Sequence, residues 1–215
     1  MRQTFFVFTV LIVLVACNNV GSANPAKETH ARDPHWDTAK SARQNLVEEL
    51  KKLQQVIASG DKEKIADIFP FPLSGTAFGI YINDSAYDVQ FNASGNNTTK
   101  AMFLQYYNKI ADAILVDQVN NLFQHLSMDS LLYKDNLKYD DYNKMEPCFY
   151  SYKIEVAKDE VILRMDMNSN SNYQSKKLSV DDLPENSSEI CEHNFWWVLR
   201  FEGNTLRLAS ISGAD

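Results

Sequence analysis

Catalytic signatures are missing from this 215-residue sequence. It has no HExxH, CxxC or GxSxG pattern and no glycine-rich phosphate loop. Its four histidines, His30, His35, His125 and His193, do not pair at a spacing typical of metal ligands. These absences argue against motif-defined hydrolases, nucleotide enzymes and zinc proteins. We therefore predict no catalytic residue, no metal and no cofactor.

Basic residues are also scarce, because 21 Lys and Arg stand against 28 Asp and Glu. A chain with this balance repels nucleic acid and anionic lipid headgroups, so we expect no nucleic-acid partner. Beyond residue 16, no apolar run approaches the length that crosses a bilayer.

What is present begins with a short apolar run over residues 5–16, followed by Cys17. The run has the length and flanks of a signal-peptide core. The tetrad Leu14-Val15-Ala16-Cys17 resembles the lipobox of bacterial lipoproteins. The resemblance implies cleavage before Cys17 and lipidation of that residue. The alternative is an ordinary secretory signal with a chance cysteine.

The mature chain would carry 20 basic and 28 acidic residues, a net charge of −8, because residues 1–16 contain only Arg2 among charged residues. Membrane attachment would therefore come from the lipid and not from a basic patch. Asn18 follows Cys17 where inner-membrane retention signals carry aspartate. By resemblance to lipoprotein sorting, we expect an outer-membrane lipoprotein that faces the periplasm.

The sequence divides into a signal peptide (1–16), a lipidated cysteine with a flexible tether (17–36), and one domain (37–215). The tether is polar, aperiodic and contains prolines. Within the domain stand two further cysteines, Cys148 and Cys191. An even pair in an exported chain predicts a disulfide, and two free thiols are the alternative.

Apolar spacing predicts a helix over residues 38–59, on the stripe Leu46, Leu50, Leu53 and Ile57, and a short helix over 61–69. Strands are expected at 78–82 and 87–91, followed by a long helix at 100–126 with a break near 118–121. Residues 134–147 read as a loop.

The C-terminal part predicts two hairpins. Segments 149–157 and 161–168 form the first. Segments 195–202 and 205–212 form the second, around the two-residue turn Gly203-Asn204. Residues 169–190, rich in Ser, Asn and Asp, are expected to be a loop. Helices followed by hairpins predict an α+β fold, with a curved antiparallel sheet packed on helices.

Segments 57–70 and 195–208 resemble the opening helices and closing hairpin of nuclear transport factor two-like, cystatin-like cone folds. The resemblance covers residues 38–212 in pattern. It implies a cone whose interior can hold a small molecule. Members of the superfamily include isomerases, dehydratases, scaffolds and exported binding modules, so the fold does not transfer a function.

Strand alternation places Tyr150, Tyr152, Met165 and Trp197 on the face that meets the helices. We expect these residues to bind a small apolar ligand. The alternative is that they simply pack in the core.

The opposite face is expected to carry Lys153, Glu155, Arg164 and Asp166 as cross-strand charge pairs. Trp196, Val198 and Ile211 are expected to lie among these charges as an apolar patch, which predicts a homodimer surface. The alternative is a solvated face held by salt bridges.

The sequence leaves three functional hypotheses open. The first is a lipid-anchored periplasmic module that binds a ligand or partner without catalysis. The second is a small-molecule enzyme of the isomerase or hydrolase kind in the cone pocket, which needs a buried ionisable group there. The third is an assembly or inhibitor protein that uses the Trp196 face.

Overall fold

The computed structural model describes residues 34–157, 160–173 and 191–214, and these form one compact unit. The predicted signal peptide, Cys17 and most of the predicted tether lie outside the described residues, as do positions 174–190 of the predicted loop. No helix in the described ranges combines the length and apolarity needed to cross a membrane.

The predicted N-terminal helix is present as α1 (Pro34–Ala58), but it begins four residues earlier than expected, within the last residues of the predicted tether. Its stripe of Leu46, Leu50, Leu53 and Ile57 is buried in the core. Glu49 lies nearby at 9% exposure, and its carboxylate accepts hydrogen bonds from Lys52 Nζ (2.6 Å) and from the Leu206 backbone N–H (3.1 Å). Burial alone would raise the pKa of Glu49, but these two bonds and the positive charges of Lys52 and Arg207 together outweigh it and lower the pKa.

The short helix α2 (Lys62–Ala66) begins at Asp61, whose carboxylate caps the backbone N–H groups of Glu63 and Lys64. It ends before Pro70, and its residues Ile65 and Ala66 are fully buried.

The strands expected at 78–82 and 87–91 are wrong. Strand β1 (Leu73–Ser74) pairs with β2 (Asn97–Thr98). In the sequence, helices α3 (Gly75–Phe78) and α4 (Ser85–Ala93) separate these two strands. Asp84 caps α4 by accepting the N–H groups of Ala86 and Tyr87. Tyr87 and Phe91 are four residues apart and share a face in a helix as well as in a strand, so their spacing could not distinguish the two.

The long helix expected at 100–126 is divided into α5 (Lys100–Gln105), α6 (Tyr107–Ala113) and α7 (Val116–His125). The breaks fall at Tyr106 and at Ile114–Leu115, so the break expected near 118–121 is wrong. Thr99 caps α5 by accepting the Met102 N–H.

A 3₁₀ helix, η1 (Met128–Leu132), leads into the sheet. Strand β3 (Asn136–Asp141) occupies part of the region expected to be a loop, which corrects that prediction. The polar residues of β3 are tolerated because, in the described part of the chain, it is an edge strand with no strand paired on one side.

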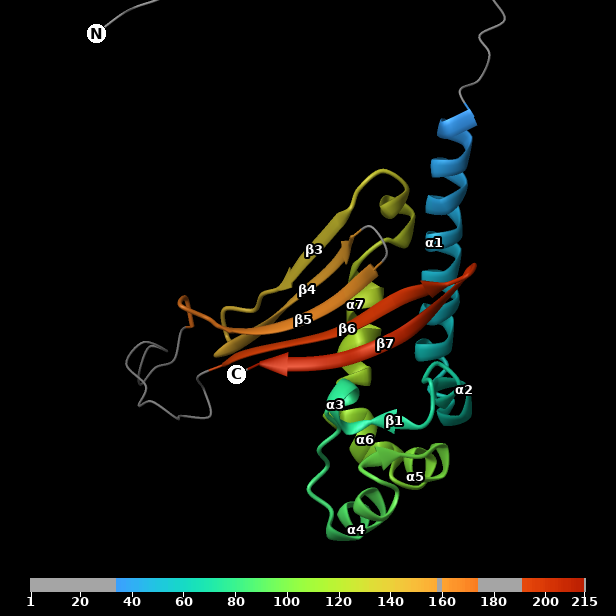
Figure 1. The fold of residues 1–215 in the computed structure, drawn as a ribbon. Helices are drawn as coiled ribbons and strands as arrows, with labels where there is room; N and C mark the ends of the chain where they lie inside the picture. The colour runs from blue at the N-terminus through green and yellow to red at the C-terminus, as the bar shows by residue number, and fades with distance from the viewer. Residues whose placement is uncertain (1–33, 158–159, 174–190, 215) are drawn as a thin grey trace, which may run out of the picture. The chain divides into compact units, whose positions relative to one another are not determined.

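The remaining strands are β4 (Cys148–Val156), β5 (Glu160–Ser169), β6 (Glu192–Glu202) and β7 (Thr205–Ala214). They form an antiparallel sheet in the order β3-β4-β5-β6-β7, with both expected hairpins in place. The α+β prediction is confirmed. Figure 1 shows the twisted sheet with α1 crossing its end at β6 and β7, and α7 against its rear face in this view.

A β-bulge in β7 changes one predicted face. Val198 pairs with Ser210 but Leu199 pairs with Leu208, so Ala209 is the extra residue. From there on, the alternation in β7 is inverted. Ile211 pairs with Trp197 and lies in the core at 4% exposure, so its expected place beside Trp196 is wrong.

Cys148 and Cys191 form a disulfide, and their Cα atoms are 5.7 Å apart, within the usual range. The bond joins the start of β4 to the residue before β6. Tyr150 follows Cys148 by two residues and His193 follows Cys191 by two residues, so the bond connects the strands that carry these two side chains.

Candidate functional site

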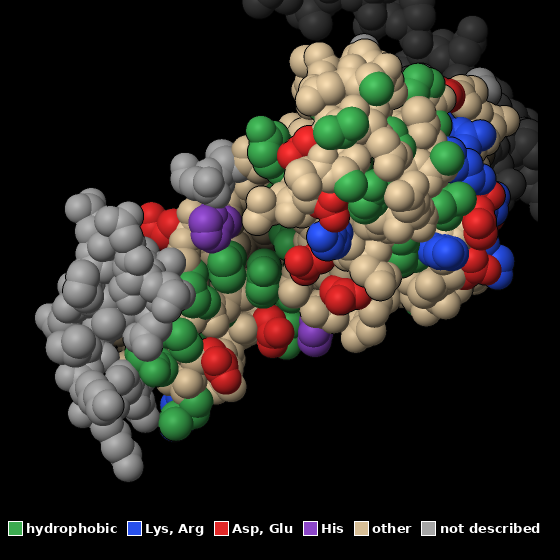
Figure 2. All heavy atoms as spheres, turned by 90° about the horizontal axis from the view of Figure 1, so that it is seen from below, with side chains coloured by type: hydrophobic (Ala, Val, Ile, Leu, Met, Phe, Trp, Pro, Cys, Tyr) green, Lys and Arg blue, Asp and Glu red, His purple; other side chains and the backbone are tan. Residues whose placement is uncertain are grey.

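The inner face of the sheet, which meets the helices, is buried along the middle of its strands and hollow at one end. The hollow, here called the sheet-end recess, has a volume of about 230 Å³. Its lining consists of Ala113, Leu115, Tyr150, Met165, Met167, His193, Asn194, Phe195 and Gly213. Figure 2 views the molecule from below and shows hydrophobic side chains gathered where the surface is hollowed between the helices and the end of the sheet.

Strand register brings these residues together from distant parts of the chain. Tyr150 pairs with Met167, which pairs with His193, and Phe195 pairs with Gly213. A Cβ atom on Gly213 would lie 3.0 Å from the Phe195 ring, so the glycine lets this ring lie close to the backbone of β7. The recess thus has an aromatic and thioether wall formed by four neighbouring strands.

The opposite wall is the junction between α6 and α7. Leu115 adopts a left-handed conformation there (φ 57°), which costs a leucine about 1–2 kcal/mol. The preceding carbonyl, that of Ile114, accepts a hydrogen bond of 2.9 Å from Trp197 Nε1. Both partners are buried, so this bond fixes the junction to β6. Strained backbone held by such contacts is typical of functional sites.

Tyr150 is half-buried and contributes a hydroxyl group to the lining of the recess. Burial raises its pKa, and the negative charge of Asp112 raises it further. Its ring stacks on Tyr152, with centroids 5.8 Å apart. Tyr150 therefore stays protonated at neutral pH and can act as a hydrogen-bond donor to a ligand.

Two of the four residues predicted to bind a ligand, Tyr150 and Met165, line the recess. Met165 is only 1% exposed, so Tyr150 is the one of the four whose side chain is partly exposed. Tyr152 and Trp197 lie in the core, at 1% and 0% exposure. The Tyr152 hydroxyl donates to Gln118 Oε1 at 2.8 Å, and burial raises its pKa to about 12. For these two residues, the structure matches the alternative of core packing.

Sequence reasoning did not select the other lining residues. Met167 and Phe195 follow the same alternation as Met165, so the sequence predicts which face of the sheet they lie on. It does not predict that the helices leave this part of the face uncovered. Ala113 and Leu115 gave no signal, because a continuous helix was expected there. His193 was considered as a metal ligand and lies at the exposed rim of the recess.

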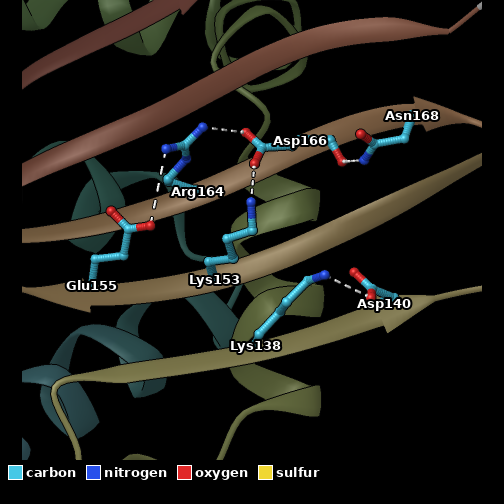
Figure 3. A network of polar contacts seen from close by, with 7 residues as sticks. All are labelled: Lys138, Asp140, Lys153, Glu155, Arg164, Asp166 and Asn168. Carbon is cyan, nitrogen blue, oxygen red and sulfur yellow. Dashed lines mark hydrogen bonds and ion pairs between the residues drawn. The ribbon is translucent and has the colours of Figure 1, made fainter.

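The outer face of the sheet carries an ion-pair network (Figure 3). Asp166 is buried at 3% exposure and accepts from Lys153 Nζ (2.9 Å) and Arg164 Nη2 (3.3 Å). Arg164 Nη1 also lies 3.9 Å from Glu155 Oε1, and Lys138 pairs with Asp140 on β3. This arrangement is the salt-bridged face considered as an alternative to an interface.

The predicted apolar patch on this face is smaller than expected. Trp196 is half-buried, and the Arg164 guanidinium lies over its ring, 5.9 Å from the ring centroid. Val198 is buried within the single chain, and Ile211 is on the other face. Trp196 is thus the one partly exposed member of the three predicted interface residues.

Among the described residues, no group of three or more His, Cys, Asp or Glu side chains is placed to hold a metal ion. Comparison of the chain with protein-family models, curated proteins and solved structures finds no match. The resemblances to lipoproteins and to cone folds therefore stay predictions from the sequence.

Proposed function

We propose that this chain is an exported, lipid-anchored module that binds a small apolar or aromatic group in the sheet-end recess, without catalysis. One observation carries the proposal. Side chains of core type, Tyr150, Met167 and Phe195, are only half-buried where they line a hollow at one end of the inner face. Large apolar side chains left partly uncovered in a concave site mark a place for a ligand.

The size of the recess limits the ligand. Small-molecule pockets commonly enclose about 300–1,000 Å³. At about 230 Å³, the recess suits a single ring or one apolar side chain of a larger partner. The thioethers of Met165 and Met167 favour an aromatic ring, because sulfur–aromatic contacts are attractive. The Tyr150 hydroxyl can donate to a polar atom on the ring edge.

An isomerase or hydrolase would need a general base in the recess. Among the described residues that line the recess there is no carboxylate, and Tyr150 stays protonated because burial raises its pKa. His193, the one histidine among the lining residues, lies exposed at the rim. This chemistry favours binding over catalysis.

The binding proposal can be tested on the unlipidated mature chain, which we define as residues 17–215 with Cys17→Ser. Its five methionines, labelled with ¹³C at the methyl group, give one NMR signal each. Titration with indole or p-cresol should shift the signals of Met165 and Met167 in a saturable manner. Those of Met102 and Met128, buried in the core away from the recess, should stay in place.

A filling variant provides the control. Ala113→Trp would place an indole in the recess from the α6 wall and should abolish the shifts. Ala101→Trp adds the same side chain at an exposed position of α5 and should leave them unchanged. Equal titration curves for the two variants would contradict the proposal.

The anchor is tested separately. Mass spectrometry of the protein from native membranes should find an N-terminus at Cys17 that carries acyl chains, and Cys17→Ser should release the chain from the membrane fraction. A Cys17→Ser chain that still sediments with membranes would refute anchoring through this residue.

A further inference from the structure

The loop between α3 and α4 exposes an aromatic side chain that the fold does not use. Tyr81 is 90% exposed, and within the described part of the chain its ring makes no ring contact and its hydroxyl no hydrogen bond. An exposed tyrosine offers a ligand a flat apolar ring with a polar tip. No residue of this loop lines the sheet-end recess, so the inference stands independently of the proposed function.

Two hollows adjoin this loop, and both are lined by Ile80, Tyr81 and Phe91. Their volumes are about 430 and 290 Å³, which are near the range of small-molecule sites. The larger also has Ser74, Gly75, Thr76, Gly79, Gly95, Asn96 and Asn97 in its lining, and the smaller has Tyr87, Asp88 and Asn92. We call the two hollows together the Tyr81 groove.

The base of the groove is held in place by short-range contacts. A Cβ atom on Gly75 would lie 2.7 Å from the Phe91 ring, so only glycine lets this ring pack against the β1–α3 backbone. The Asn97 side-chain amide donates to the carbonyls of Ser94 (3.1 Å) and Gly95 (3.0 Å). At the other end of the loop, Asp84 caps α4 and pairs with Lys109 Nζ at 2.7 Å.

Besides Tyr81, the unpartnered polar side chains of the groove, counted over the described residues, are one carboxylate and two amides. The side chains of Asp88, Asn92 and Asn96 are exposed and form no hydrogen bond within the described residues. Amides can both donate and accept, and a carboxylate accepts. Neither lining contains Lys or Arg, so an anionic ligand would meet Asp88 without a compensating cation. A wholly apolar ligand would cover the amides without satisfying them.

We propose that the Tyr81 groove binds a neutral oligosaccharide, with sugar units on both sides of Tyr81. A pyranose ring presents a face of C–H groups, which suits an aromatic ring, and a rim of hydroxyls that donate and accept hydrogen bonds. The exposed Tyr81 ring matches the first of these features, and Asn92, Asn96 and Asp88 match the second. The two hollows provide room for more than one sugar unit.

The test is a titration of the ¹⁵N-labelled unlipidated mature chain with cellotetraose, maltotetraose and chitotetraose, followed by amide NMR. At least one of them should shift the amides of residues 79–83 and 88–97 in a saturable manner, while those of the sheet-end recess stay in place. Tyr81→Ala should weaken that binding by at least about tenfold. Tyr133→Ala removes a tyrosine that is equally exposed (88%) outside the groove, and should bind like the wild type.

Tetralysine serves as the competing probe, because the carboxylate of Asp88 could attract a basic peptide. Binding of tetralysine but of no sugar would overturn the proposal. So would the absence of any shift with all three sugars, or equal affinities of the Tyr81→Ala and Tyr133→Ala variants. The amide spectra of both variants report whether the fold is intact.

Discussion

Trp197→Phe tests whether the indole of Trp197 fixes the wall of the recess. The substitution removes the donor to the buried Ile114 carbonyl, and an unsatisfied buried acceptor costs about 1–3 kcal/mol. The smaller ring also leaves a cavity in a fully buried position, which adds about 1–2 kcal/mol. We therefore expect the free energy of unfolding to fall by about 2–5 kcal/mol.

The assay is urea unfolding of the unlipidated mature chain, followed by far-ultraviolet circular dichroism. With a slope of about 2 kcal/mol per M, the unfolding midpoint should fall by about 1–2.5 M. Trp196→Phe is the matched control. That residue is half-buried on the outer face, so its substitution should cost about 1 kcal/mol or less. Equal losses in the two variants would refute the role assigned to Trp197.

Four further outcomes are expected. Glu49→Gln should destabilise the chain at pH 7, because the pKa of the Glu49 carboxyl is lower in the folded chain than in the unfolded chain, and the ionised form therefore stabilises the fold. The difference between variant and wild type should shrink as the pH falls through the lowered pKa of the folded state, and denaturant titrations across pH measure it. Replacing Cys148 and Cys191 together by serine should lower the free energy of unfolding by about 3–4 kcal/mol, measured in urea. Asp84→Ala should speed hydrogen exchange of the first amides of α4, and unchanged exchange would argue against the cap. If the outer face forms a homodimer, Trp196→Ala should give a monomer in light scattering, and a monomeric wild type would rule the dimer out.

The sheet was the most predictable part of the fold. Strict alternation in β4, β5 and β6, together with the Gly203-Asn204 turn, specified both hairpins and the inward position of Trp197. The bulge at Ala209 was not predictable, because an alanine in a strand gives no sign of an extra residue. It moved Ile211 from the outer face to the core.

The helices between the sheet and α1 were less predictable. Local caps, not apolar spacing, determine α3 and α4, and Asp84 was the available signal. The break at Leu115 has no sequence signal, because a leucine is unfavourable in a left-handed conformation. Its position depends on the tertiary bond from Trp197 to the Ile114 carbonyl. The recess could not be located from the sequence for the same reason, since this junction forms one of its walls.

The most direct test of the proposed function is an NMR measurement of contacts between bound indole and the methionine methyl groups of the unlipidated mature chain. Binding in the sheet-end recess predicts nuclear Overhauser effects from the indole ring protons to the methyls of Met165 and Met167, and none to that of Met102. Contacts elsewhere on the chain, or no contact at saturating indole, would contradict the account.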